Sequence, residues 1–177
     1  MGSVGHVAVG LAATRVFRGG RAPAWWAMAG WSALSLLPDA DVIGFSFGVH
    51  YADPWGHRGA THSLVLALAF GAVIASGARL IEASSRRTAL FAVVVLASHG
   101  LLDTLTDGGR GVALLWPVDL TRYFAPWRPI PVAPIGRAFL SPSGLSVSLV
   151  ELALFAPFLI YAAWPRNGEA ISSSRTS

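Results

Sequence analysis

The chain has 177 residues, of which 54% are hydrophobic and only 12% are charged, and its mean hydropathy is +0.57. A soluble domain usually carries about a quarter charged residues, so the composition predicts a small, single-domain α-helical membrane protein. The 13 basic residues are all Arg and lie scattered between apolar segments, so the net charge of +4 does not indicate a nucleic-acid partner. The lack of Cys excludes disulfides and thiolate metal ligands.

Five apolar segments approach the roughly 20 residues that a membrane-spanning helix needs. They comprise residues 4–17, 22–37, 63–81, 88–105 and 145–164. The first is short enough to be a half-span or an interfacial helix, and the second is rich in Trp, as expected near a membrane interface. The sequence therefore predicts an all-α polytopic bundle of about four or five hydrophobic helices within residues 1–165. For the polar, Ser-rich tail at residues 166–177 we expect disorder.

The connecting segments alternate in length and in Arg content. Two short loops at residues 15–21 and 79–87, and the C-terminal tail, are dense in Arg, whereas the long loops at residues 38–61 and 106–144 carry Arg more sparsely. The positive-inside rule then places the short loops in the cytoplasm and the long loops outside an inner membrane of the prokaryotic type. The second long loop is rich in Pro, Trp and Arg, which forbids a long helix and predicts a cap in the headgroup region.

Several ionisable residues stand at the ends of the apolar segments. The candidates for a functional site are His6, Asp39, Asp41, His57, Arg58, His62, His99 and Asp103. With the topology above, all of them lie toward the outer side of the membrane. Ionisable groups at membrane depth are costly and therefore indicate function, and His with carboxylate is a donor set for zinc or another divalent ion.

Within this set, two pairs have an informative spacing. His99 and Asp103 are four residues apart and share one helical face, so they can bind one metal ion together, or Asp103 can orient His99. A hydrogen bond that only joins two helices fits them equally well. Asp39 and Asp41 alternate in a turn, so one can bind a metal ion while the other supports it, although an ordinary solvated turn has the same pattern.

The densest polar patch runs from His57 to His62. These two His side chains can meet if His57 lies in the loop and His62 begins the next helix, and Arg58 between them suits a phosphate or carboxylate. A loop that contacts lipid headgroups has the same composition. His6 is a candidate only because the predicted topology places it on the same side of the membrane as the other residues. Glu151, in the last apolar segment, is expected to pair with a buried Arg or to line a cavity, not to bind metal.

In this order, the polar patches resemble those of a known family. They read Gly5-His6, Leu36-Leu37-Pro38-Asp39-Ala40-Asp41, Gly56-His57-Arg58-Gly59-Ala60-Thr61-His62-Ser63, Ser98-His99-Gly100-Leu101-Leu102-Asp103 and Leu114-Leu115-Trp116-Pro117. They look like the YdjM-like membrane-bound metal-dependent hydrolases, also described as LexA-binding, inner-membrane-associated hydrolases, over residues 5–117. That family is considered distantly similar to zinc-dependent phospholipase C and the S1/P1 nucleases, α-helical enzymes that cleave phosphodiesters at a multi-zinc site.

The resemblance implies a set of metal ligands. It assigns this role to His57, His62, His99 and Asp103, with Asp39 or Asp41 and His6. One departure follows Leu105-Thr106, where a Pro-containing stretch is expected and Asp107-Gly108-Gly109 stands instead. The departure changes the loop near the site without removing a proposed ligand.

The sequence thus predicts a membrane-bound metal-dependent hydrolase that acts on a phosphoester or lipid-like substrate at the membrane interface. Zinc, or alternatively manganese, would activate a water, Asp39 or Asp41 would serve as general base, and Arg58 would neutralise a phosphate. The alternative is a non-enzymatic scaffold or regulatory protein with a structural metal or hydrogen-bond cluster. A proton- or metal-relay transporter is disfavoured because the inner halves of the apolar segments are almost purely apolar.

Overall fold

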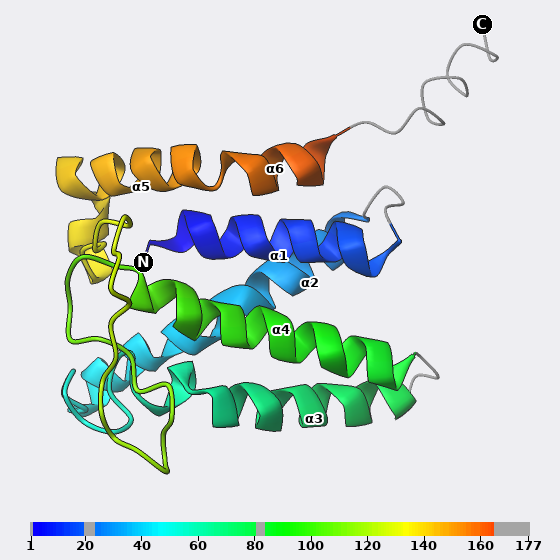
Figure 1. Cartoon of the computed structure of the whole chain (residues 1–177), viewed down its shortest axis with the longest axis horizontal. Coiled ribbons are helices and arrows are strands. Elements are labelled where there is room, and N and C mark those ends of the chain that lie inside the picture. The colour runs from blue at the N-terminus through cyan, green and yellow to red at the C-terminus, as the bar shows by residue number, and fades with distance from the viewer. Residues whose placement is uncertain (1, 20–23, 81–83, 165–177) are drawn as a thin grey trace, which may run out of the picture.

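The computed structural model describes residues 2–19, 24–80 and 84–164 of the chain (Figure 1). Within these ranges the protein is helical and contains no β-strand, which confirms the all-α prediction. The helices are α1 (Ser3–Phe17), α2 (Trp25–Leu36), η1 (Leu37–Phe47), η2 (Ala60–His62), α3 (Leu64–Leu80), α4 (Ser85–Thr104), η3 (Gly136–Leu140), α5 (Pro142–Leu154) and α6 (Ala156–Ala163), where η denotes a 3₁₀-helix. The tail that we expected to be disordered lies outside the described residues.

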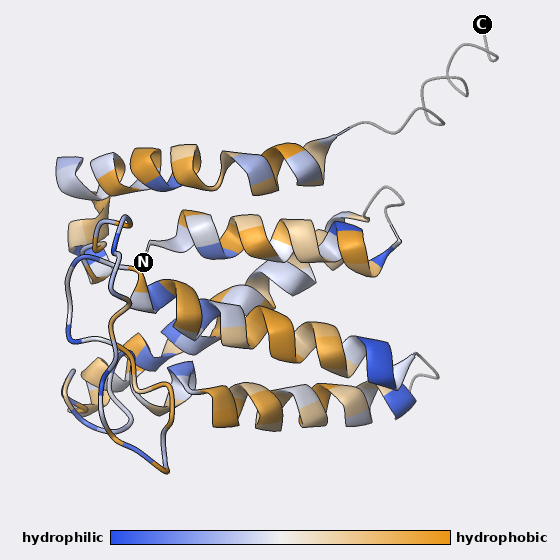
Figure 2. Ribbon diagram, viewed as in Figure 1, coloured by the Kyte–Doolittle hydropathy of each residue, from blue (hydrophilic) through white to orange (hydrophobic). Residues whose placement is uncertain are grey.

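Helix α1 occupies the middle of the bundle. It packs against α2 and α4 on one side and against α5 and α6 on the other, while α3 packs on α4 (Figure 1). The long irregular segments at residues 48–59 and 105–135 gather at one end, beside the start of α1 and the end of α4. Hydrophilic residues concentrate in these loops and at the opposite end of α3 and α4 (Figure 2). We call the loop-bearing end the site end and the other the arginine end.

Small residues make the closest helix contacts. A Cβ atom on Gly10 of α1 would lie 2.6 Å from the Cα of Ser32 in α2, and one on Gly71 of α3 would lie 2.3 Å from Cγ2 of Val93 in α4. Most of the buried apolar residues of the helices are Ala, whereas large apolar side chains face outward, among them Leu68, Val73, Leu90, Val94, Leu145 and Leu149. Small residues inside and large apolar residues outside are typical of helices that pack within lipid.

The number of spanning helices is smaller than the sequence suggested. Among the described helices only α4 is long and apolar enough to cross a membrane alone, and α5 with α6 meets the same test as a pair bent by 62°. Helices α1 and α3 have 15 and 17 residues, so at 1.5 Å per residue they fall short of the roughly 30 Å of hydrocarbon. The expectation of four or five spans is therefore wrong.

Proline residues explain two of the early helix ends. Pro38 lies just beyond the end of α2 at Leu36, and the chain continues there as the 3₁₀-helix η1. Pro157 lies in the first turn of α6, where its missing amide hydrogen breaks the last apolar segment into α5 and α6. An apolar stretch of spanning length is thus divided into shorter helices.

Candidate metal centre

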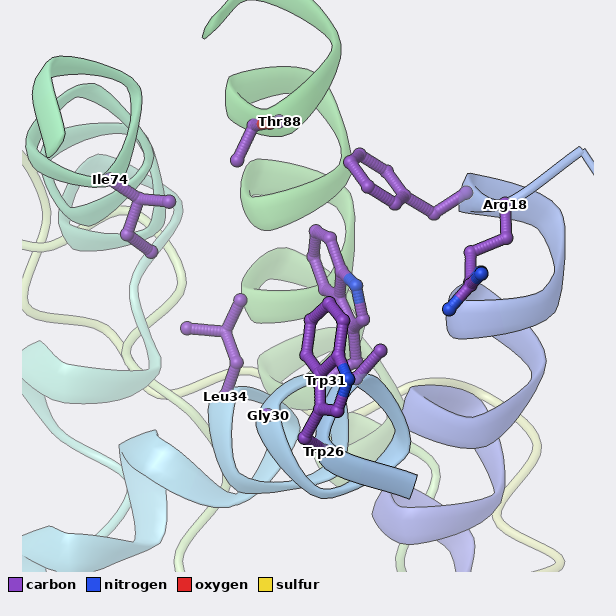
Figure 3. A pocket seen from close by; sticks show the side chains of 9 residues that line it. Arg18, Trp26, Gly30, Trp31, Leu34, Ile74 and Thr88 are labelled. Carbon is purple, nitrogen blue, oxygen red and sulfur yellow. The ribbon is translucent and has the colours of Figure 1, made fainter. Parts of the chain in front are cut away.

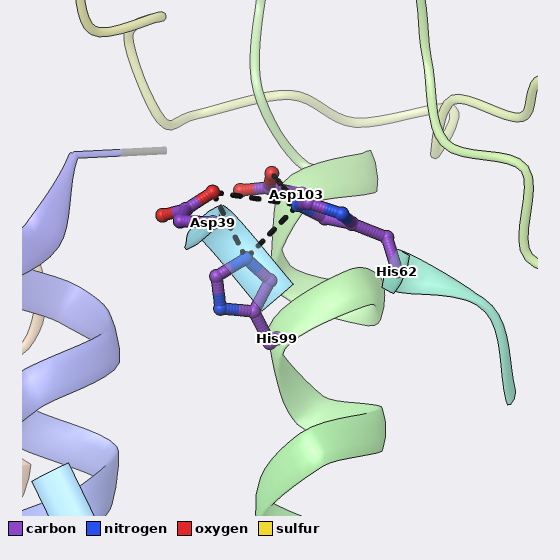
Figure 4. A group of neighbouring side chains, drawn as sticks. All are labelled: Asp39, His62, His99 and Asp103. Carbon is purple, nitrogen blue, oxygen red and sulfur yellow. Dashed lines mark hydrogen bonds and ion pairs between the residues drawn. The ribbon is translucent and has the colours of Figure 1, made fainter. Parts of the chain in front are cut away.

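Four ligand-type side chains converge at the site end of the bundle. Asp39 comes from η1, His62 from η2, and His99 and Asp103 from the last turns of α4. Each offers one donor atom, and these atoms all lie within 4.8 Å of one another (Figure 4). The structure therefore brings into one cluster four residues that are spread over more than sixty positions of the sequence.

The donor atoms of this cluster lie at contact distances. The Nε2 atoms of His62 and His99 are 3.1 Å apart. Oδ1 of Asp39 lies 3.4 Å from Nε2 of His62 and 3.3 Å from Nε2 of His99, and Oδ2 of Asp103 lies 3.5 Å from Nε2 of His62. Two imidazole lone pairs repel at such a distance unless a proton or a cation lies between them. A shared divalent ion satisfies all four atoms together.

The opposite ring nitrogens are held by hydrogen-bond acceptors. Nδ1 of His99 donates to the backbone oxygen of Ser35 at 2.7 Å. Nδ1 of His62 lies 3.0 Å from the Thr61 hydroxyl, which itself donates to Asp41. These contacts place a proton on Nδ1 of each ring and turn Nε2 of each ring toward the cluster, which is the orientation seen in metal-ligating His.

Close backbone approach makes this geometry possible. A Cβ atom on Gly100, next to His99 in α4, would lie 2.2 Å from the backbone oxygen of His62. The absence of a side chain at this position therefore lets α4 rest directly on η2. Without that contact His62 and His99 would stand farther apart.

Asp41 supports the cluster from behind. Its Oδ1 accepts a hydrogen bond from Nδ1 of His57 at 2.8 Å, and its Oδ2 accepts from the Thr61 hydroxyl at 2.8 Å and from the Arg58 amide at 3.2 Å. Its side chain is 1% exposed, whereas that of Asp39 is 26% exposed. Of the two alternating carboxylates, Asp39 therefore belongs to the four-residue cluster, whereas Asp41 orients its neighbours and forms, with His57 and His62, a second group that could hold a metal ion.

Arg58 is buried and pairs with Asp103. Its Nε lies 3.1 Å from Oδ2 of Asp103, and its Nη1 donates to the Thr106 hydroxyl at 2.8 Å and to the Gly108 carbonyl at 3.1 Å. A Cβ atom on Gly109, where φ is +88°, would lie 2.9 Å from Nη1 of Arg58. The Gly108-Gly109 pair, which departs from the family pattern, thus lets this loop close over the guanidinium.

His6 enters the site from α1. Its ring stacks on that of His99 with 3.6 Å between centroids, and its Nε2 lies 3.5 Å from Oδ1 of Asp103. The side chain is fully buried, yet neither ring nitrogen makes a hydrogen bond to any described residue. Because an unsatisfied buried polar group is costly, this orphaned imidazole fits a site that takes up a further ligand such as a metal ion.

Glu151 of α5 fixes the start of α1. Its carboxylate accepts hydrogen bonds from the backbone amides of Gly2 and, at 3.1 Å, Gly5. The expectation that Glu151 pairs with a buried Arg or lines a cavity is therefore wrong: it satisfies amides at a helix N-terminus, where a negative charge is favoured. Sequence reasoning missed this role because nothing local places α5 beside α1.

The electrostatics of the loop residues favour a cation. Burial by itself would raise the pKa of Asp39. The contacts with His62 and His99 lower it by more than burial raises it, so the pKa of Asp39 lies well below the usual range. Burial lowers the pKa of His62, but contacts with three carboxylates raise it to about 10. With His62 neutral, the three carboxylates and one guanidinium that meet here leave two negative charges, which one divalent ion would balance.

A cavity of about 460 Å³ adjoins the cluster. Asp39, His57 and Arg58 contribute to its wall together with Tyr51 and the loop residues 132–136. The cavity gives a small molecule access to the exposed side of Asp39. The mixed nitrogen and oxygen donors fit zinc or manganese.

Comparison with known proteins agrees with the membrane-type architecture. The sequence model of the YdjM inner membrane protein family matches residues 1–168 of the chain. The chain is also similar to the inner membrane protein YbcI of Escherichia coli (strain K12), with 47% identity over 121 residues, which cover 67% of this chain and 70% of YbcI. No solved structure matches the chain.

Proposed function

The chain belongs to the YdjM inner membrane protein family, and from this premise and its His/Asp cluster we propose that it is a metal-dependent hydrolase of the inner membrane. Its substrate would be a phosphoester or a lipid-like molecule at the membrane interface. The observation that supports this proposal most is the meeting of four ligand atoms within 4.8 Å beside a cavity that also presents a guanidinium.

Asp39, His62, His99 and Asp103 would hold the ion, and the orphaned imidazole of His6, which stacks on the His99 ring, would contribute a further nitrogen. Zinc or manganese, when bound, supplies Lewis acidity and lowers the pKa of a coordinated water toward neutrality. The hydrogen bond to Ser35 and the contacts of His62 with Thr61 keep both His rings in the tautomer that binding needs.

His57 is the candidate general base. Its Nδ1 is held by Asp41 at 2.8 Å, so the basic lone pair remains on Nε2, and the residue lines the cavity. A carboxylate that orients an imidazole in this way is the usual support for a proton-transferring His. Because both oxygens of Asp41 already accept hydrogen bonds, we assign proton transfer to His57 and an orienting role to Asp41.

Arg58 would bind the substrate phosphate through Nη2 of its guanidinium group. Nε and Nη1 contact Asp103, Thr106 and Gly108, whereas Nη2 makes no hydrogen bond to a described residue. Arg58 also lines the cavity. An Arg beside a metal cluster is suited to the second oxygen of a phosphate.

The substrate would enter from the headgroup layer on the outer side of the membrane. The cluster lies at the end of the bundle formed by the long loops, and the described Arg residues of the short loops lie at the other end. The positive-inside rule then directs the arginine end to the cytoplasm. An amphiphile whose phosphate lies at headgroup depth would reach the cavity directly.

One observation favours the non-enzymatic alternative, a scaffold or regulator with a structural metal. Four protein ligands can close a tetrahedral site, and closed coordination is typical of structural zinc. The cavity against Asp39 favours catalysis instead. Hydrolysis assays separate the two, because a structural site binds metal without turnover.

The decisive experiment compares metal content and phosphodiesterase activity in two double variants of the detergent-purified protein. His99→Ala/Asp103→Ala removes two cluster ligands. His50→Ala/Asp53→Ala removes a similar but solvent-exposed pair, whose side chains are 86% and 46% exposed, as a matched control. We expect zinc or manganese in the native protein and the control, its loss in the cluster variant, and hydrolysis of a chromogenic phosphodiester only where metal is present. Full metal content in the cluster variant would overturn the ligand assignment.

A further inference from the structure

A second feature of the protein lies at the arginine end, away from the metal cluster. An apolar groove of about 550 Å³ runs between α1, α2, α3 and α4. Trp26, Leu34 and Ile74 border it, with Arg18 at its edge (Figure 3). None of the candidate metal ligands lines it, so the groove requires an explanation of its own.

A basic mouth adjoins this groove. A second hollow of about 470 Å³ is lined by Phe17, Arg18, Gly19 and Arg87. It shares Phe17 and Arg18 with the apolar groove, so the two lie side by side. Together they form a cleft that is apolar along its length and cationic at one end.

The two arginines at the mouth are suited to an anion. Nη2 of Arg87 donates to the backbone oxygen of Val16 at 3.2 Å, and its guanidinium lies 5.1 Å from the centre of the Phe17 ring, which holds it in place. The Arg18 side chain makes no hydrogen bond or ion pair with any described residue. Every described carboxylate belongs to the site end or its loops, so none of them neutralises this mouth.

The groove stays open because α2 carries a glycine in its wall. A Cβ atom on Gly30 would have no heavy atom within 4 Å. Gly30 therefore does not serve close helix packing, unlike Gly10 in α1. Its effect is to widen the groove between Trp26 and Leu34.

We propose that this cleft binds one anionic phospholipid. An acyl chain fills the apolar groove between Trp26 and Ile74, and the phosphate lies beside Arg18 and Arg87. Charge complementarity selects the ligand: a cationic mouth favours a headgroup with net negative charge over a zwitterionic one, and Trp residues beside the groove are typical of headgroup depth. The site is independent of the metal centre and binds lipid without hydrolysing it.

Native mass spectrometry of the detergent-purified full chain tests the proposal, with phosphatidylglycerol and phosphatidylcholine added at equal concentration. We expect preferential retention of one phosphatidylglycerol molecule. Arg18→Gln and Arg87→Gln should each weaken its binding about fivefold, whereas the control Arg86→Gln, next to Arg87 but outside the cleft, should not. Thermal unfolding of each variant checks that the fold is retained.

A glycine pair supplies a second, steric test. Gly30→Leu should fill the groove and abolish retention of phosphatidylglycerol. Gly77→Leu on the exposed face of α3, where a Cβ atom also meets no neighbour, should leave it unchanged. Equal retention of the two lipids, or native-like retention by Gly30→Leu, would overturn the proposal. So would a dimer of the native chain that Gly30→Leu dissociates, because a second copy would then occupy the groove.

Discussion

The ring of His6 lies flat on the ring of His99, with 10° between their planes and 3.6 Å between their centroids. This stack joins the first turns of α1 to the last turns of α4 at the centre of the cluster. Both rings are fully buried, and Nδ1 of His99 is fixed by a backbone carbonyl, whereas His6 lacks any such hydrogen bond among the described residues. The two rings therefore have different roles, which substitutions can separate.

His6→Phe keeps an aromatic ring on His99 and removes both nitrogens. We expect the metal affinity of this variant to fall by at least about 10- to 100-fold, the range that loss of a group supporting a ligand already produces. His6→Ala should lose as much affinity and also some stability. Metal titration with a fluorescent competitor measures both, and native affinity in His6→Phe would show that the ring acts only by stacking.

His57→Gln tests the proposed general base. The substitution removes the Nε2 lone pair but keeps a group that can donate to Asp41. We expect turnover of a phosphodiester to fall by about 10²- to 10⁴-fold, the usual contribution of acid–base catalysis, while metal content stays native. Loss of the metal together with activity would instead identify His57 as a ligand, as the family resemblance implies.

Glu151→Gln tests the link between α5 and the start of α1. The substitution keeps the size of the side chain but removes the negative charge that the amides of Gly2 and Gly5 contact. We expect a loss of about 1–2 kcal/mol of stability, as for charges at partly buried helix ends, and a weaker metal affinity because His6 lies one turn away. A thermal unfolding midpoint equal to that of the native protein would contradict the first expectation.

Gly100→Ala should separate α4 from η2. The added methyl group would lie 2.2 Å from the backbone oxygen of His62, and backbone has little room to yield. We expect a loss of about 1–3 kcal/mol, which is usual for overpacking, and loss of metal. Gly77→Ala, in open space on α3, is the matched control and should be neutral or stabilising because Ala favours helix.

The affinity for metal should rise with pH. The pKa of His62 is raised to about 10, so in metal-stripped protein at neutral pH this ring carries a proton that an incoming ion must displace. Below that pKa, each unit of decreasing pH should weaken binding about tenfold for each proton released. Calorimetry in buffers of different ionisation enthalpy counts the protons, and release of none would contradict the prediction.

Short-range patterns in the sequence predicted many of the residues in the candidate site. The four-residue spacing of His99 and Asp103 indicated a shared helical face, and both side chains do reach one cluster. The alternation of Asp39 and Asp41 indicated that one carboxylate binds and the other supports; the structure places Asp39 beside His62, His99 and Asp103 and gives Asp41 contacts with His57 and Thr61. That choice depends on loops folding back, which local spacing does not encode.

The number of spanning helices and the contacts between distant residues could not be predicted from the sequence. Hydropathy found the apolar segments, but it overestimated the number of spans because α1, α2 and α3 have only 15, 12 and 17 residues, and because the last segment is broken at Pro157. The contact of Glu151 with Gly5 joins residues 146 positions apart. Arg58 was expected to meet a phosphate or a carboxylate of a substrate, whereas the structure pairs it with Asp103 of the same chain. Such pairings depend on which helices pack side by side, and no local pattern in a single sequence predicts this.

The scatter of the ligands along the chain has a consequence for biogenesis. Residues of the cluster come from α1, η1, η2 and α4, and the loop that covers Arg58 follows at Thr106 and Gly108. No nascent chain shorter than about these first hundred residues contains the whole set. Binding of a metal ion at this centre would therefore be a late event, possible only after α4 has been inserted beside α1, and a bound ion would report that the bundle has assembled.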